Sequence, residues 1–307
     1  MHLVLEELVT AKPAPRPIDS LATWWTRHRE LSARFPVPVD VAILAGFAAD
    51  RLGYAFASGY QAAGAELFAG RVVGEPRLSA LCVTEAGGAH PRAIATTLRR
   101  GEHGLRLDGE KRFVTLGPAA ERLFVVASEG LLPDGKNRLR VAAIDARRAG
   151  VTLRTEATAF VPEIPHAVAT FDGVTVADDE LLAGDGYLEF VKPFRTVEDC
   201  HVHAALLGWW VQLARRADAS HDLLEALFAR VVTMRALALA DPKSAAVHLA
   251  LGGALASARQ LLAELEPLVA RLDAETRTRF ERDRPLLKVA GRARELRREA
   301  AWRTLSG

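Results

Sequence analysis

The fold is decided between Leu78 and Val126, where two segments read LSALCVTEAGGAHP (78–91) and DGEKRFVTLGP (108–118). Each segment contains a short apolar run that ends in a threonine, Thr84 or Thr115, and a glycine-containing break follows each threonine. Runs of this length, bounded by Gly and Asp-Gly, are typical of strands joined by turns. A strand that ends beside a glycine-rich loop can present backbone N–H groups to a polar ligand. The stretch therefore predicts two strands with a candidate binding edge, and it does not specify the ligand.

Further short strands are expected downstream of these two segments. They are separated by polar turns and lie at 123–127, 139–144, 151–154, 166–171 and 174–176. Many short strands with regular turns indicate a barrel or a sandwich. We expect residues 77–184 to form this β-domain.

Helical patterns flank the strands on the N-terminal side, in residues 1–76. Asp19 or Ser20 is a candidate cap for a helix that carries Trp24 and Trp25, which we expect to pack in the core rather than to face a partner. Apolar residues keep helical spacing from 39 to 69, over one long helix or two shorter ones. Asp40 is the candidate N-cap there, and three glycines allow close helix packing: Gly46, Gly53 and Gly59.

The pattern turns helical again in residues 185–307. Four helices are expected, near 187–217, 220–240, 243–272 and 275–304, with Ser220 and Asp273 as caps. Short connections between antiparallel neighbours indicate a four-helix bundle. The last helix is rich in arginine interleaved with glutamate, which favours a solvated or subunit-facing surface over a nucleic-acid stripe.

Composition narrows the function classes. Of the 307 residues 50% are apolar and 25% charged, which is ordinary for a globular protein. The formal net charge of +2 gives no reason to expect a nucleic-acid or membrane partner. The two cysteines, Cys82 and Cys200, have no metal-site spacing and fit a reduced, cytoplasmic chain. His201 and His203 are two apart, so on a helix they point away from each other and do not chelate one metal ion.

The two segments resemble the β-domain signatures of the acyl-CoA dehydrogenases. Residues 82–87 are similar to the first signature, apolar–Thr–Glu–Pro–Gly–Ala–Gly–Ser–Asp, and residues 109–117 to the second, Gly–Glu–Lys–x–Trp–Ile–Thr–Asn–Gly. Residues 169–176 and 181–184 resemble the strand that closes the same domain. The resemblance covers about residues 40–215, and two motifs in order are more specific than a lone glycine pattern. It suggests a shortened, divergent branch of this family.

The resemblance implies an α+β fold with N-terminal helices, a central antiparallel β-barrel and a C-terminal four-helix bundle, the order that periodicity also indicates. It implies FAD as cofactor, an acyl-CoA or other thioester as substrate, and a homodimer or homotetramer. In the family, the threonine of the second motif bonds near flavin N5 and that of the first meets the pyrimidine edge. By position these are Thr115 and Thr84, unless both are ordinary strand threonines. The implied cofactor-binding set is Cys82, Val83, Thr84, Phe113, Val114 and Thr115.

The resemblance implies a glutamate base, but it points less directly to one residue of this sequence. Most members carry the base late in the last domain, in a context that this sequence lacks. A minority carry it on the first helix of the bundle, and Glu198 falls at that position. Arg195 precedes it by three residues, and an i, i+3 pair would lower the pKa of Glu198, which favours a structural ion pair over a proton acceptor.

Two departures weaken the implied site. The usual Gly–Ser–Asp is replaced by Ala89-His90-Pro91, so His90, with Arg195, is the candidate contact to substrate, unless His90 is a solvent-facing loop histidine. The Arg–x–x–Phe–Gly segment that holds the adenine half of FAD in the family is also missing. Three functions follow: an acyl thioester dehydrogenase, an inactive binding or assembly protein of the same fold, or a flavin-dependent monooxygenase.

Overall fold

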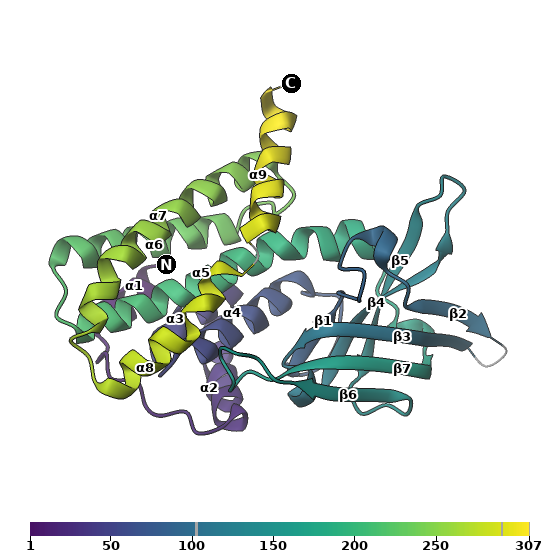
Figure 1. Cartoon of the computed structure of the whole chain (residues 1–307), viewed down its shortest axis with the longest axis horizontal. Helices are drawn as coiled ribbons and strands as arrows, with labels where there is room; N and C mark the ends of the chain where they lie inside the picture. The colour runs from purple at the N-terminus through teal and green to yellow at the C-terminus, as the bar shows by residue number, and fades with distance from the viewer. Residues whose placement is uncertain (102–103, 290, 307) are drawn as a thin grey trace. The chain divides into compact units, whose positions relative to one another are not determined.

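The computed structural model describes residues 1–101, 104–289 and 291–306, which form two compact units (Figure 1). Unit 1 consists of Met1–Glu66, Ala159–Glu163 and Arg195–Gly307, and unit 2 of Leu67–Thr158 and Ile164–Phe194. The helices before and after the strands therefore belong to one unit. The division into 1–76, 77–184 and 185–307 as three domains stays a prediction.

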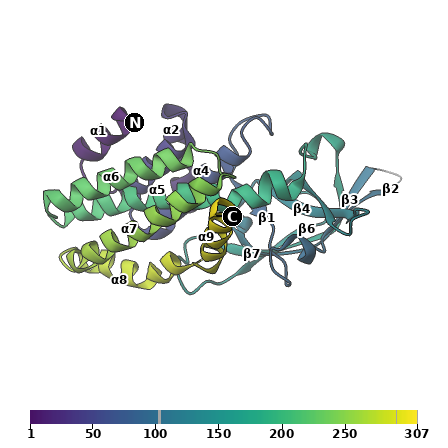
Figure 2. The same cartoon turned by 90° about the horizontal axis from the view of Figure 1, so that it is seen from above.

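Unit 1 is helical. Its helices are α1 (His2–Thr10), α2 (Leu21–Arg34), α3 (Pro38–Ala48), α4 (Leu52–Leu67), α5 (Lys192–Arg216), α6 (His221–Ala238), α7 (Ala245–Val269), α8 (Ala274–Asp283) and α9 (Gly291–Ser306). Helices α6 and α7 run alongside each other in both views (Figure 2). Within the described ranges, no helix has the length and apolar character needed to cross a membrane.

Side-chain caps begin three of these helices as the sequence predicts. Ser20, Ser220 and Asp273 each accept a hydrogen bond from a backbone N–H in the first turn of α2, α6 and α8. The prediction for Asp40 is wrong, because Val37 is the N-cap of α3. Asp40 is buried and accepts from the Arg235 guanidinium at 2.6 and 3.0 Å, so it joins α3 to α6.

The predicted single helix over 275–304 is also wrong. Helix α8 ends at Asp283, a 3₁₀ turn follows over Arg284–Lys288, and α9 begins at Gly291. Pro285 lies in that turn, where its ring and missing N–H prevent an α-helix from continuing. Residues 39–69 form two helices, α3 and α4. Trp24 is buried and donates from Nε1 to Ser58 Oγ at 2.9 Å, which confirms that it packs in the core.

Glycines bring α3 and α4 close to α5. A Cβ at Gly46 would lie 1.9 Å from the Ala205 carbonyl oxygen, and one at Gly59 would lie 2.5 Å from Val202 Cα. Three buried alanines meet at the same place, one each from α3, α4 and α5: Ala42, Ala62 and Ala205. The close packing expected from Gly46 and Gly59 is therefore confirmed.

Two glycines of α4 give a matched test of this packing. We expect Gly59→Ala to lower the free energy of unfolding by about 1–3 kcal/mol, because the added methyl overlaps the α5 backbone. Gly64 has open space at its Cβ position, so Gly64→Ala should raise the stability by up to about 1 kcal/mol through helix propensity. Urea unfolding followed by tryptophan fluorescence measures both, since the five tryptophans all lie in unit 1. Equal effects of the two variants would contradict the packing argument.

Unit 2 is built on one seven-stranded sheet. Its strands are β1 (Ser79–Cys82), β2 (Thr97–Gly101), β3 (Gly104–Thr115), β4 (Arg122–Leu131), β5 (Asn137–Asp145), β6 (Val151–Glu156) and β7 (His166–Val176). The order is β1-β4-β2-β3-β7-β6, with β5 paired to β4. The expectation of an antiparallel barrel needs correction, because β1 and β2 both pair with β4 in parallel and β6 pairs only with β7 among the described strands. A mixed, curled sheet replaces it (Figure 1).

Alternation along the strands gives the sheet its two apolar faces. One face packs a core that includes Cys82, Leu107, Val114 and Phe171. The other face packs Phe124 against Phe68, whose ring centroids are 3.6 Å apart, and Phe68 in turn stacks on Phe190. Successive side chains of a strand point to opposite faces of the sheet, so one strand contributes buried residues to both cores.

Candidate functional site

The two sequence motifs meet in unit 2. The Arg112 N–H donates to the Thr84 carbonyl oxygen at 2.7 Å, which ties the segment after β1 to the end of β3. Lys111 Nζ donates to the Val83 carbonyl at 3.2 Å and to Glu85 Oε1 at 2.6 Å. The motifs are thus held together by both main-chain and side-chain bonds.

The Glu85–Lys111 ion pair is buried, with side-chain exposures of 8% and 0%. Glu85 also accepts from the N–H groups of Ala95 at 2.7 Å and Thr96 at 3.0 Å. Burial raises the pKa of Glu85, but the bonds from Lys111 and from these two N–H groups outweigh it, so its pKa lies below the usual value. A charged pair satisfied in this way fixes the turn 85–88 relative to β3.

A β-bulge near the end of β3 presents Phe113. Lys111 pairs with Ala169 and Val114 with Ala167, so β3 carries one extra residue there. Phe113 has φ 55°, a left-handed conformation that bulky side chains rarely adopt, and it is 68% exposed. Strained backbone of this kind is concentrated at functional sites. The aromatic ring is therefore directed out of the sheet beside Thr115, where a ligand can meet it.

Both motif threonines are half-buried, and neither hydroxyl forms a hydrogen bond within the part of the chain that the structure describes. Cys82 and Val114 are buried in the sheet core, and burial raises the pKa of the Cys82 thiol to about 12. Val83 packs against the opposite core. Of the six predicted cofactor residues, three offer a side chain and Cys82, Val83 and Val114 can offer only main-chain groups.

His90 lies exposed in the loop after the first motif. Its Nδ1 accepts from the Arg92 N–H at 3.2 Å and caps a 3₁₀ turn over Pro91–Ala93. The Glu85 and Gly88 backbones exchange two hydrogen bonds before it, at 3.1 and 2.9 Å. His90 keeps only Nε2 for a ligand.

Glu198 lies on α5 in unit 1, half-buried. Burial raises its pKa to about 7, the Asp199 charge adds to the rise, and Arg195 and Arg294 oppose it. The expected Glu198–Arg195 ion pair is wrong: no such bridge occurs among the described residues, and Arg195 is exposed. A carboxyl with a pKa near 7 is suited to proton transfer at neutral pH.

On helix α5, Asp199 rather than Glu198 forms ion pairs with arginine. Arg294 and Arg297 of α9 donate to its two carboxylate oxygens at 2.8 and 2.6 Å. Burial raises the pKa of Asp199, but the arginines outweigh it and the net pKa is lowered. The sequence analysis missed this cluster. The only signal of this cluster in the sequence was the i, i+3 spacing of Arg294 and Arg297. That spacing indicates that both side chains lie on one face of a helix, but it does not identify the residue that they contact.

We expect Asp199→Asn to lower the apparent pKa of Glu198. The substitution removes the neighbouring negative charge and leaves Arg294 unbalanced beside Glu198, and both changes favour the carboxylate. NMR titration of Glu198 measures the shift, with Asp222→Asn, on the first turn of α6, as a control that leaves it unchanged. A rise in the pKa would contradict this electrostatic account.

Comparison with curated protein sequences gives a match over part of the chain. No family model matches the sequence. A 120-residue stretch is 29% identical to benzylmalonyl-CoA dehydrogenase from Aromatoleum aromaticum, and it spans 37% of this chain and only 31% of that relative. Over that stretch the chain is similar to an acyl-CoA dehydrogenase.

Solved structures extend the likeness in fold to most or all of this chain. An FAD-dependent dehydrogenase superposes with a TM-score of 0.76 at 15% identity, over 100% of this chain and 98% of that chain. Butyryl-CoA dehydrogenase from Megasphaera elsdenii gives 0.63 at 14% identity, over 86% and 80%. At such identities the likeness shows the fold.

Each of the two histidines of helix α5 bonds to the backbone of that helix through Nδ1, and the buried Nε2 of His201 has no hydrogen-bond partner among the described residues. His201 Nδ1 contacts the Val197 carbonyl and His203 Nδ1 the Asp199 carbonyl, each at 2.8 Å. Burial is the main cause that lowers the pKa of both rings to about 4. Across residues 1–101, 104–289 and 291–306, no three His, Cys, Asp or Glu side chains are grouped to hold a metal.

Proposed function

We propose that the protein is a flavoprotein that binds FAD and oxidises the Cα–Cβ bond of an acyl thioester. The observation that carries this proposal is the strained, exposed Phe113 beside two half-buried threonines whose hydroxyls are unbonded. An aromatic side chain and two polar groups, held on β3 and on the segment after β1 that is bonded to it, fit the face and edges of a flavin ring, because a protein's part is to orient the cofactor. The residues present therefore fit the group.

Each residue has a defined task in this proposal. Thr115 and Thr84 donate or accept at the polar edges of the ring, and Phe113 covers its face. Glu198 removes the α-proton of the thioester onto a carboxylate oxygen, for which a pKa near 7 is suitable. The bound flavin would supply the hydride acceptor.

His90 and Arg195 are exposed and are proposed to contact the substrate. The family's adenine-binding segment has no counterpart here, so we assign no residue to the adenine half of FAD. A cytoplasmic homodimer or homotetramer completes the proposal.

Flavin loading tests the proposal first. The purified full chain should be yellow, or should take up added FAD with quenching of the flavin fluorescence. Thr115→Val and Phe113→Ala should each weaken FAD binding by about tenfold or more, the size expected for one lost hydrogen bond or ring contact. Thr170→Val, an exposed threonine of β7, is the matched control. A colourless protein that takes up no FAD would reject the proposal in favour of an inactive relative.

Substrate oxidation is the second stage. Addition of an acyl-CoA panel without oxygen should bleach the flavin absorbance. Flavin that stays bound and unbleached by every acyl-CoA would reject thioester oxidation and favour the flavin-dependent monooxygenase.

A further inference from the structure

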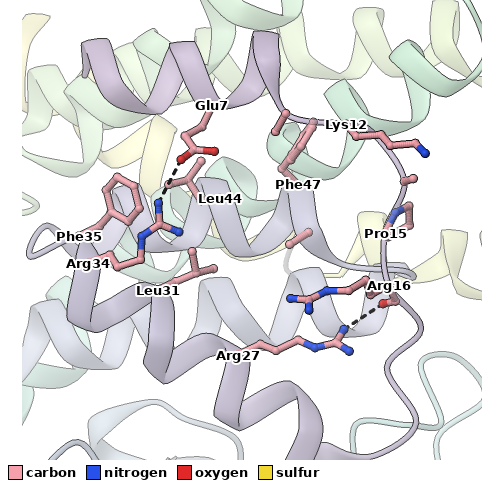
Figure 3. A pocket seen from close by; sticks show the side chains of 13 residues that line it. Glu7, Lys12, Pro15, Arg16, Arg27, Leu31, Arg34, Phe35, Leu44 and Phe47 are labelled. Atoms are coloured by element: carbon pink, nitrogen blue, oxygen red, sulfur yellow. Dashed lines mark hydrogen bonds and ion pairs between the residues drawn. The ribbon is translucent and has the colours of Figure 1, made fainter.

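A pocket with a volume of about 220 Å³ lies in unit 1, away from the residues discussed above (Figure 3). Helices α1, α2 and α3 surround it together with the connector 11–17. Its apolar wall comes from Leu31, Leu44 and Phe47, and the last two are at most 8% exposed. The pocket is thus lined on one side by hydrocarbon that water wets poorly.

The opposite wall carries positive charge. Arg16, Arg27, Arg34 and Lys12 line the pocket, and the carboxylate of Glu7 is bonded to Arg34 at 3.1 Å. Arg27 donates to the Arg16 and Pro17 carbonyl oxygens at 2.9 and 3.0 Å, which fixes its guanidinium. Figure 3 shows the Arg16 side chain directed into the pocket and the Arg27 side chain running along its edge to the Arg16 carbonyl oxygen, whereas the Lys12 amine points away.

Arg16 and Arg27 have no carboxylate partner within the described ranges. Two guanidinium groups that line one cavity without a carboxylate between them repel each other. An anion between them would remove this cost. The planar fork of a guanidinium also matches carboxylate and phosphate oxygens geometrically.

We propose that this pocket binds a small molecule in which an oxyanion, a carboxylate or a phosphate, is joined to a compact apolar body. A dry cavity of about 150 Å³ holds benzene, so about 220 Å³ admits a ring with one anionic group. It is below the range of about 300–1,000 Å³ that drug-sized ligands need, which excludes a whole CoA thioester. The inference does not depend on the proposed function.

Isothermal titration calorimetry of the full chain with benzoate and with phenyl phosphate tests the proposal. At least one probe should bind with one-to-one stoichiometry, and comparison of the two identifies the head group. Arg16→Gln should weaken binding by at least about tenfold, since it removes a charged hydrogen bond. The Arg16 side chain forms no hydrogen bond or ion pair within the described residues, so the variant should fold as the parent does. Arg29→Gln is the matched control, because Arg29 is exposed on the opposite face of α2.

A second variant brings a competing anion to the pocket. Ala14 lines it and is exposed, so Ala14→Glu should abolish binding by placing a carboxylate beside Arg16 and Arg27. Benzamide, which has the ring without the charge, should not bind the parent protein. Failure of both anions to bind, or equal binding to the parent, Arg16→Gln and Ala14→Glu, would overturn the proposal.

Discussion

Replacing Lys111 with methionine should lower the free energy of unfolding of unit 2 by about 3–5 kcal/mol. The substitution leaves Glu85 with 8% exposure and no cation beside its carboxylate. Only the Ala95 and Thr96 N–H groups would then stabilise the charge. Because the tryptophans all lie in unit 1, fluorescence does not report this loss, and amide hydrogen exchange in β3 and β7 is the measurement.

Substitution of Glu85, the ion-pair partner of Lys111, provides the control for this loss of stability. Glu85→Leu with Lys111→Met removes both charges, and the double variant should recover much of the stability lost in Lys111→Met. Lys136→Met breaks an ion pair with Asp134 whose side chains are 76% and 51% exposed, so it should change stability by less than about 1 kcal/mol. If Lys111→Met exchanged as slowly as the parent, the buried pair would not hold the motifs together.

Most of the strands and the starts of three helices could be predicted from the sequence because their signals are local. Thr84 and Thr115 end apolar runs bounded by glycine, and Ser20, Ser220 and Asp273 precede helical periodicity. The parallel pairing of β1 with β4 could not be predicted, because the pairing partner of a strand is a long-range property. Pro285 did carry a local signal against one helix over 275–304, because proline disfavours the interior of an α-helix.

The candidate site shows the same division between local and distant information. The family resemblance implied that Thr84 and Thr115 would share one region, and the Arg112–Thr84 backbone bond joins their segments. Helical spacing suggested that Arg195 pairs with Glu198. Instead, Asp199 bonds to Arg294 and Arg297, which lie 95 and 98 residues further along the chain. No local pattern shows that Glu198 is buried, and burial is the main cause that raises its pKa, so the direction of the shift could not be predicted correctly.

If Glu198 is the proton acceptor, Glu198→Gln should reduce kcat/KM for acyl-CoA oxidation by about 10²–10⁴-fold. An amide cannot take up the α-proton, while FAD binding should remain unchanged. In the parent, kcat/KM should rise with pH through about 7, because the carboxylate form is required. Glu225→Gln, an exposed position on α6, is the matched control. Activity unchanged in Glu198→Gln would exclude this residue as the base.

The pH dependence of the free energy of unfolding distinguishes a Glu198 that can act as a base from a Glu198 that is paired with arginine. No assay of activity is needed. The pKa of Glu198 is raised from 4.5 to about 7 on folding, so its neutral form is favoured and its contribution to stability is complete below pH 4.5. That contribution is lost as pH rises through 7, where the half-buried carboxyl must ionise. Glu198→Gln should therefore gain stability relative to the parent between pH 5 and pH 8. A glutamate paired with Arg195 would have a lowered pKa, and its glutamine variant would lose stability at pH 8. Urea unfolding of unit 1 at the two pH values distinguishes these opposite signs.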